Sequence, residues 1–161
     1  LLSQTCTFIG GYESKHMTMI ENISRLSYSM YLNEEAYNAL KQMYDDLYKN
    51  TKKRFLVTSA YKSYDVLNLE ENTSQAGYSE FQLGTSVSLK VNGIKDVEFV
   101  STDVYQWLLE HSYEYGYVLR YPSDKVTITQ KESCNIFRYV GKENAQKMHN
   151  QNLCLEELNN Q

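Results

Sequence analysis

The sequence lacks several features that would point to particular classes of protein. No apolar run among its 161 residues approaches the roughly 18 residues that a membrane-spanning helix needs, so we expect no membrane span. The 16 Lys and Arg residues are scattered among 20 Asp and Glu residues, with one short run at residues 52–54, which gives a net charge of -4 and no extended basic stripe. Without such a stripe to neutralise phosphates, nucleic acid is a poor candidate partner.

Cysteine is scarce and does not form a metal-binding or redox pattern. The chain has Cys6, Cys134 and Cys154, an odd number at wide spacings and with no CxxC pair. At most one disulfide is possible, and the compartment cannot be read from these residues. The chain starts at Leu1 without a basic region followed by an apolar one, so we expect it to be a processed or excised piece of a longer protein.

The composition is that of an ordinary globular protein, with 42% hydrophobic and 22% charged residues. This length suits one domain. Tyrosine occurs 15 times against a single tryptophan. A surface rich in Tyr would suit contact with carbohydrate or peptide. The alternative is that these side chains lie half-buried in the core, and the sequence leaves both interpretations open.

Residues 1–26 show no clear period and are interpreted as a lead-in, with one domain over residues 27–161. The spacing predicts a helix after Asn33, which is a plausible N-cap followed by acidic residues in the first turn. Its buried face is predicted to hold Ala36, Leu40, Met43, Tyr44 and Leu47.

Several short β-prone runs come after this helix. Strands are predicted at residues 55–59, 87–91, 117–121 and 136–140. Asn92-Gly93 indicates a hairpin turn, so residues 94–100 are predicted to form the returning strand. Residues 101–103 are expected to cap a second helix, and a further helix is expected after Gly141. The fold class predicted is α+β, with helices packed on a small antiparallel sheet.

Four segments at characteristic spacings carry a resemblance to a known family. They are SAYKSY at 59–64, GYSEFQLG at 77–84, WL at 107–108 with YGYVLRYP at 115–122, and FRYVG at 137–141. In this order they resemble the VanY-type D-alanyl-D-alanine carboxypeptidases, zinc peptidases that trim the terminal D-Ala from cell-wall stem peptides. The resemblance covers about residues 27–158 and implies the D-Ala-D-Ala carboxypeptidase (VanY/hedgehog-like) fold.

The positions that carry the chemistry in that family differ here. The family pattern Ser-x-His-x-x-Gly-x-x-x-Asp supplies two zinc ligands, and the matching positions hold Phe81 and Ser88. The pattern Glu-x-Trp-His supplies the general base and the third ligand, and those positions hold Ser133 and Ile136. A phenyl ring and a sec-butyl group offer no lone pair to a metal. We therefore expect no metal, no cofactor and no catalytic residue, and we expect Phe81 and Ile136 to extend the core into the former metal cavity.

Two other routes to chemistry find little support in the sequence. His16, His111 and His149 lie far apart in the chain, and none falls at a ligand position. Cys134 lies next to the former base position, but a thiol nucleophile needs a nearby histidine, and none is identifiable.

The resemblance also implies positions that could still bind a ligand. Ser79 matches the family serine that helps to hold the substrate carboxylate, and Lys62 stands where the family has an arginine beside the carbonyl oxygen. Arg120 and Arg138 match arginines of the family's Arg-Tyr motifs, although they could equally tie strands together by pairing with carboxylates such as Glu80. The candidates for ligand contact are Lys62, Tyr78, Ser79, Arg120 and Arg138.

Two functions of different classes are consistent with these positions. The first is a catalytically inactive module that binds a peptidoglycan stem peptide in the vestigial groove. The second is a structural or regulatory domain with a filled groove that contacts an envelope protein through exposed Tyr side chains. A residual carboxypeptidase is a third and weaker interpretation. The family's setting implies an extracytoplasmic location in a bacterium.

Overall fold

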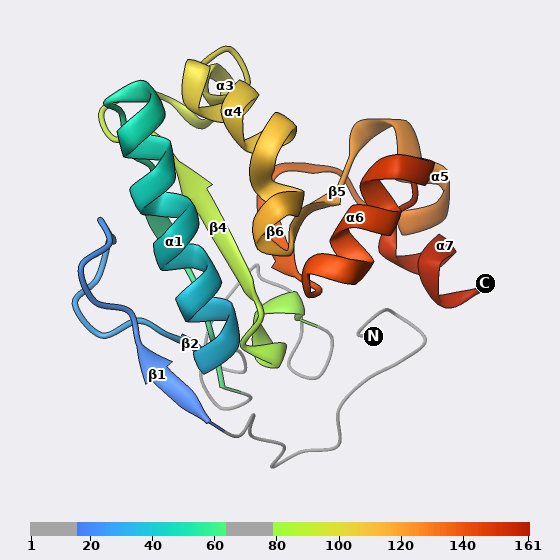
Figure 1. Cartoon of the computed structure of the whole chain (residues 1–161), viewed down its shortest axis with the longest axis horizontal. Coiled ribbons are helices and arrows are strands. Elements are labelled where there is room, and N and C mark those ends of the chain that lie inside the picture. The colour runs from blue at the N-terminus through green and yellow to red at the C-terminus, as the bar shows by residue number, and fades with distance from the viewer. Residues whose placement is uncertain (1–15, 64–78) are drawn as a thin grey trace.

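The computed structural model describes residues 16–63 and 79–161, which form a four-stranded antiparallel sheet with helices on its faces and a separate two-stranded sheet (Figure 1). The elements in chain order are β1 (Met17–Met19), β2 (Tyr31–Asn33), α1 (Glu34–Thr51), β3 (Leu56–Ser59), η1 (Glu80–Leu83), β4 (Ser86–Lys90), α3 (Asp96–Phe99), α4 (Asp103–His111), η2 (Ser112–Tyr115), β5 (Tyr117–Tyr121), η3 (Ser123–Lys125), α5 (Val126–Thr129), β6 (Ser133–Tyr139), α6 (Lys142–Gln151) and α7 (Leu155–Asn159). The strands of the large sheet are ordered β3-β4-β6-β5. The α+β class predicted from the sequence is confirmed.

Helix α1 begins and packs as its sequence predicts. The Asn33 side chain accepts a hydrogen bond from the backbone N–H of Glu35 at 3.0 Å, which satisfies one of the free donors of the first turn. The five residues predicted for its inner face are all buried. The buried Tyr117 hydroxyl donates to the Ala36 carbonyl at 2.6 Å and ties α1 to β5. Figure 1 shows the helix lying across one face of the sheet.

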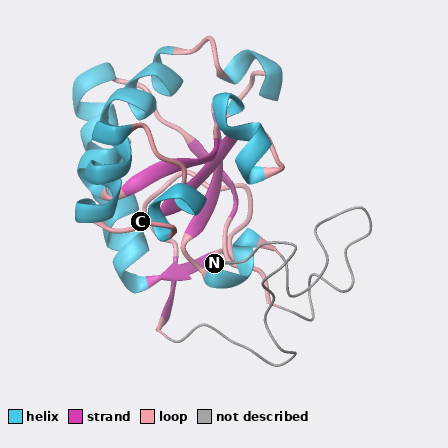
Figure 2. Cartoon of the chain, turned by 90° about the vertical axis from the view of Figure 1, so that its right-hand side faces the viewer, coloured by secondary structure: helices cyan, strands magenta, loops and turns pink. Residues whose placement is uncertain are grey.

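The large sheet has two different faces because neighbouring side chains of a strand point in opposite directions. Val87 and Leu89 of β4 and Phe137 of β6 belong to the main core, which they share with α1. Ser86 and Ser88 alternate with them on the second face. Val118 of β5 packs in a smaller cluster with residues of α6 and α7, so these C-terminal helices cover part of that second face. Figure 2 shows strands enclosed between helices.

The hairpin predicted at residues 87–100 is wrong. Asn92-Gly93 is followed by the short helix α3, whose start is capped by the Glu98 carboxylate accepting from the backbone N–H of Lys95 at 3.1 Å. Phe99 is fully buried, whereas Val97 is 79% exposed. Strand β4 takes β3 and β6 as its neighbours, so no edge is left for a strand from residues 94–100.

The described part of the predicted lead-in packs with the domain. Strand β1 pairs with β2, and the Ile20 N–H donates to the Met30 carbonyl at 2.7 Å. Ile20 and Ile23 are buried in the main core. Residues 16–26 therefore contribute to the same hydrophobic core as the rest of the chain. In residues 16–63 and 79–161, no helix combines the length and the apolar character that crossing a bilayer requires.

Candidate functional site

The second face of the sheet brings together two of the positions that the resemblance assigns to zinc ligands. Strands β4 and β6 pair antiparallel, and Ser88 lies directly opposite Ile136 in their register. Both residues are buried, with 7% and 8% of their surface exposed. Cross-strand partners in such a ladder have Cβ atoms about 4.5–5.5 Å apart. The two side chains are thus immediate neighbours.

The third position, Phe81, lies in the short helix η1, which is fixed at both ends. Ser79 caps the start of η1, and its Oγ accepts from the Phe81 N–H at 3.3 Å. Gly84 ends the helix in the left-handed region at φ 69°, and its carbonyl accepts from the Asn33 N–H at 2.7 Å. A Cβ at Gly84 would meet Cε of Met17, the end of a flexible side chain, so the left-handed backbone is the main reason for glycine here.

Lys62 lies beside η1. Its backbone N–H donates to the Phe81 carbonyl at 3.2 Å. Its ammonium Nζ lies 5.9 Å from the centre of the half-buried Phe81 ring, within reach of a weak cation–π attraction. The structure therefore joins Lys62, Ser79 and Phe81 at one end of the second face, whereas Tyr78 lies outside the described residues.

The side chains at these positions do not fit a zinc ion. Zinc is held in proteins by three or four nitrogen, sulfur or carboxylate oxygen ligands. Phe81 and Ile136 have no such atom, and Ser88 has only a hydroxyl. In the described ranges 16–63 and 79–161, no three His, Cys, Asp or Glu side chains are grouped so that they could hold a metal. At the former base position, the Ser133 hydroxyl is hydrogen-bonded to the Asn135 side chain at 2.8 Å.

Two of the three histidines, His111 and His149, have local contacts of their own. His111 pairs with Glu114, with 3.2 Å between Nδ1 and the carboxylate oxygen. His149 stacks on the Tyr113 ring with 3.8 Å between ring centres. Cys134 is a half-buried free thiol in β6.

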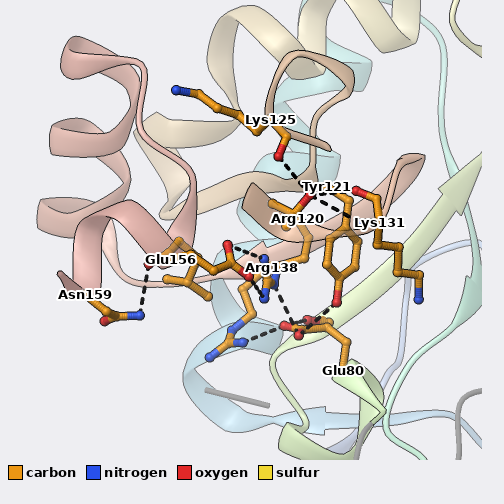
Figure 3. Close-up of polar contacts among 11 residues, drawn as sticks. Glu80, Arg120, Tyr121, Lys125, Lys131, Arg138, Glu156 and Asn159 are labelled. Carbon is orange, nitrogen blue, oxygen red and sulfur yellow. Dashed lines mark hydrogen bonds and ion pairs between the residues drawn. The ribbon is translucent and has the colours of Figure 1, made fainter. Parts of the chain in front are cut away.

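A buried network of charges lies next to Phe81, around Glu80 (Figure 3). Glu80, the first residue of η1, has 2% of its side chain exposed. One of its oxygens accepts from Nη1 of Arg138 at 2.5 Å and from the Ser86 hydroxyl at 3.1 Å. Its other oxygen accepts from the Tyr121 hydroxyl at 3.4 Å and lies 3.2 Å from Nε of Arg120.

The charges around Glu80 keep it ionised despite its burial. Burial by itself would raise the pKa of its carboxyl group, but the positive charges of Arg138 and Arg120, with the hydrogen bonds from Arg138 and Ser86, outweigh that effect and lower the pKa overall. Burial, together with the negative charge of Glu80, raises the pKa of the neighbouring Tyr121 hydroxyl to about 12, so Tyr121 is a neutral donor to this carboxylate.

Arg120 extends the network to the C-terminal helix. Only 1% of its side chain is exposed. Its Nη1 and Nη2 donate to the two oxygens of Glu156 in α7, at 3.1 and 2.8 Å, in a bidentate pair. Its Nε lies 3.2 Å from a carboxylate oxygen of Glu80, but the geometry of this contact is not that of a hydrogen bond. The charges therefore alternate along the series Arg138, Glu80, Arg120 and Glu156.

Arg120 and Arg138 thus pair with carboxylates, as one of the two interpretations of the sequence expected. A role for them in ligand binding stays a prediction. Arg138 is 14% exposed and also borders a surface depression of about 450 Å³ between the end of β6 and helices α6 and α7. Sequence reasoning named Glu80 as a partner but missed Glu156, Ser86 and Tyr121. The only signal for Glu156 in the sequence is its place in an acidic pair, Glu156-Glu157, which the structure puts in the first turn of α7.

Comparisons with known proteins agree with this architecture. A family model described as VanY, D-alanyl-D-alanine carboxypeptidase, matches residues 66–142. A D-alanyl-D-alanine carboxypeptidase of Enterococcus faecium is 32% identical over 152 residues, which cover 89% of this chain and 49% of that protein. The chain contains a VanY-family D-alanyl-D-alanine carboxypeptidase domain. It spans between about a third and about half of the length of the curated relatives that it matches.

Solved structures give the same VanY fold. The LD-carboxypeptidase LdcB superposes with a TM-score of 0.89 and 28% identity, covering 99% of this chain and 84% of that one. VanYB, solved in complex with D-alanine-D-alanine, superposes with a TM-score of 0.79 and 26% identity, covering 99% and 96%. The fold expected from the resemblance is therefore confirmed.

Proposed function

We propose that this VanY domain binds a peptidoglycan stem peptide without hydrolysing it. The observation that carries the proposal is the set of side chains at the three positions that the resemblance assigns to zinc ligands, namely a phenyl ring, a hydroxyl group and a sec-butyl group. Two of these positions, Ser88 and Ile136, are buried register partners. Without three donor side chains there is no site to lower the pKa of a bound water, and Ser133 offers no carboxylate to accept its proton.

The frame around the former metal site supports the binding half of the proposal. Ser79 keeps its place at the start of η1, and because its oxygen accepts from Phe81, its O–H remains a donor. Lys62 supplies a positive charge close by. Ser79 and Lys62 both contact Phe81, and a hydroxyl donor and an ammonium group in one region would suit the terminal carboxylate of a peptide. The relatives' activity on cell-wall peptides also supports an extracytoplasmic location for this chain.

A titration tests binding and hydrolysis together. The ¹⁵N-labelled domain is titrated with a stem peptide ending in D-Ala-D-Ala, and with the same peptide amidated at its C-terminus. We expect amide shifts at Ser79, Gln82 and Gly84 with the free carboxylate and much smaller shifts with the amide. We also expect no release of D-alanine and no stoichiometric zinc in the purified protein. Unchanged amides near Ser79 at millimolar peptide would remove the binding proposal, and released D-alanine would remove the inactive one.

Substituting the proposed cation sharpens this test. Lys62→Ala should weaken binding about tenfold or more, since hydrogen bonds to charged groups contribute about 1.5–3 kcal/mol. Lys53→Ala is the matched control, because Lys53 is an exposed lysine that pairs with Asp103 far from η1. Equal affinities of the two variants would contradict the assignment of Lys62.

Exposed apolar side chains favour a second candidate, a domain that contacts an envelope protein. Leu26 is 66% exposed, Tyr28 75% and Tyr31 41%, and all three lie in or next to the segment between β1 and β2. Exposed Tyr side chains are common in protein interfaces. If the titration leaves the amides around Ser79 unchanged, this candidate becomes the better one. It can then be tested with a photo-crosslinking residue in place of Tyr28.

A further inference from the structure

We infer that Glu156 is a positioning residue for η1, acting through Arg120 and Glu80. The C-terminal helix α7 would thereby be mechanically coupled to the segment that carries Ser79 and Phe81. The inference depends on the charge network alone and holds whether or not the domain binds a stem peptide. Glu156 and Glu80 are 76 positions apart in the sequence, and Arg120 lies between their carboxylates (Figure 3).

Arg120 is a buried cation that depends on its carboxylate partners. With 1% of its side chain exposed, the guanidinium group receives little help from water. Glu156 accepts from both of its Nη atoms. If Glu156 loses its charge, Arg120 keeps its own charge, since an arginine does not deprotonate in proteins. A buried charge that loses a partner is strongly unfavourable, so the guanidinium group will turn towards its remaining carboxylate, Glu80.

Glu80 is the residue through which Arg120 reaches η1. This residue starts η1, and its two oxygens are shared among Arg138, Ser86, Tyr121 and Arg120. If Arg120 interacts more strongly with the Glu80 carboxylate, the contacts of Glu80 to Arg138 and Ser86 become weaker. These two contacts attach η1 to β6 and β4. The backbone of η1 is a single short 3₁₀ segment, and the hydrogen bonds at its two ends are long, from the Gln82 N–H to the Ser79 carbonyl at 3.2 Å and from the Gly84 N–H to the Phe81 carbonyl at 3.3 Å. We therefore expect η1 to become more mobile when the contacts of Glu80 weaken.

Amide hydrogen exchange measures this coupling directly. In Glu156→Gln we expect exchange at Gln82 and Gly84 to speed up about tenfold, since coupled neighbours in one network interact by amounts of that order. Amides in the middle of α1, such as Leu40 and Met43, report global opening and should keep their rates. A uniform rise that includes α1 would overturn the inference, because it would show general destabilisation.

Glu157→Gln provides a matched control on the same helix. Glu157 pairs with Lys125 and its carboxylate accepts from the Cys154 N–H at the start of α7. Glutamine is also accepted at this capping position. We expect this variant to speed exchange in α7, for example at Leu158, and to leave η1 unchanged. If Glu156→Gln likewise affects α7 alone, Glu156 only docks its own helix and the inference fails.

A double-mutant cycle tests the route through Arg120. In an Arg120→Met background no cation links Glu156 to Glu80. Glu156→Gln should therefore cause no further change in the amide exchange rates of Gln82 and Gly84. The same added increment in that background would refute the route. If Glu156→Gln does not fold, Glu156→Asp replaces it. That variant keeps the charge but withdraws it by one methylene, and it should give a smaller rise at the same two amides.

Discussion

Restoring the zinc ligands is the most direct test of the site assignment. The variant carries Phe81→His, Ser88→Asp and Ile136→His. Since Ser88 and Ile136 are opposite each other in the β4–β6 register, their new side chains start from neighbouring Cβ atoms, and η1 presents the third from a fixed backbone. The fold already places the backbone of these three positions, so the substitutions change only their side chains. We expect the triple variant to bind zinc and the unmodified domain not to.

The size of the effect can be worked out from binding linkage. At a zinc concentration 100-fold above the dissociation constant, a ligand that binds only the folded state stabilises it by about 2.7 kcal/mol. For a domain of this size, each kcal/mol raises Tm by about 2–4 °C, so zinc should raise the Tm of the triple variant by roughly 5–10 °C. Without zinc the variant should be less stable than the unmodified domain, because Ile136→His removes apolar burial that contributes about 1.5–3 kcal/mol.

Thermal unfolding followed by circular dichroism, with zinc or with a chelator, measures both effects, and metal analysis gives the stoichiometry. The control is the double variant Phe81→His with Ser88→Asp, which has only two ligands and should bind much more weakly. Adding Ser133→Glu to the triple variant supplies the missing base and should allow release of D-alanine from a stem peptide. A folded triple variant that binds no more zinc than the double variant would refute the assignment of these positions.

Further predictions concern stability. Arg120→Met leaves Glu156 without its bidentate partner and should lower the free energy of unfolding by roughly 3–5 kcal/mol in urea titrations. Asn33→Ala removes the cap of α1 and should cost about 1 kcal/mol by the same measurement. Gly84→Ala should cost at least about 1–2 kcal/mol because of its left-handed backbone. Finally, the lowered pKa of Glu80 means that its ionised form stabilises the fold above its ordinary pKa of 4.5, and that this stability is lost as the pH falls through the lowered value. The gap in stability between the unmodified domain and Glu80→Gln should therefore be full at pH 7 and shrink at acid pH.

Local signals made α1 predictable. Its cap at Asn33, its acidic first turn and its apolar spacing all fall within about one helix length, and the structure confirms each of them. The same reasoning failed at residues 94–100. Asn92-Gly93 is a strong hairpin signal, but a second strand can form after a turn only if the preceding strand has a free edge. The neighbours of β4 are β3 and β6, and the residues that pair with it from β6 lie about 50 positions away.

The candidate site also contains residues that the sequence predicts and contacts that it does not. The family motif placed Ser88 and Ile136 at ligand positions, and the strand register then put them side by side. Glu80 could be named as a partner because it lies inside the motif. The pairing of Arg120 with Glu156 crosses 36 positions and joins a strand to a helix, so no periodicity in the sequence predicts it. Long-range ion pairs of this kind require the fold to be known first.

The residues that position η1 are distinct from the residues that would hold a metal. Ser79 caps the segment, Gly84 lets it turn against β1, and Glu80 fixes it to two strands through Arg138 and Ser86. None of these contacts uses the side chain of Phe81. In domains whose folding depends on a structural metal, losing the ligands unfolds the chain. Here the frame has its own hydrogen bonds and buried ion pairs, so the domain can lose zinc and keep the surface that would face a peptide. The proposal that the domain binds a peptide without hydrolysing it is physically consistent with this arrangement, because the side chains that position η1 differ from the side chains at the proposed ligand positions.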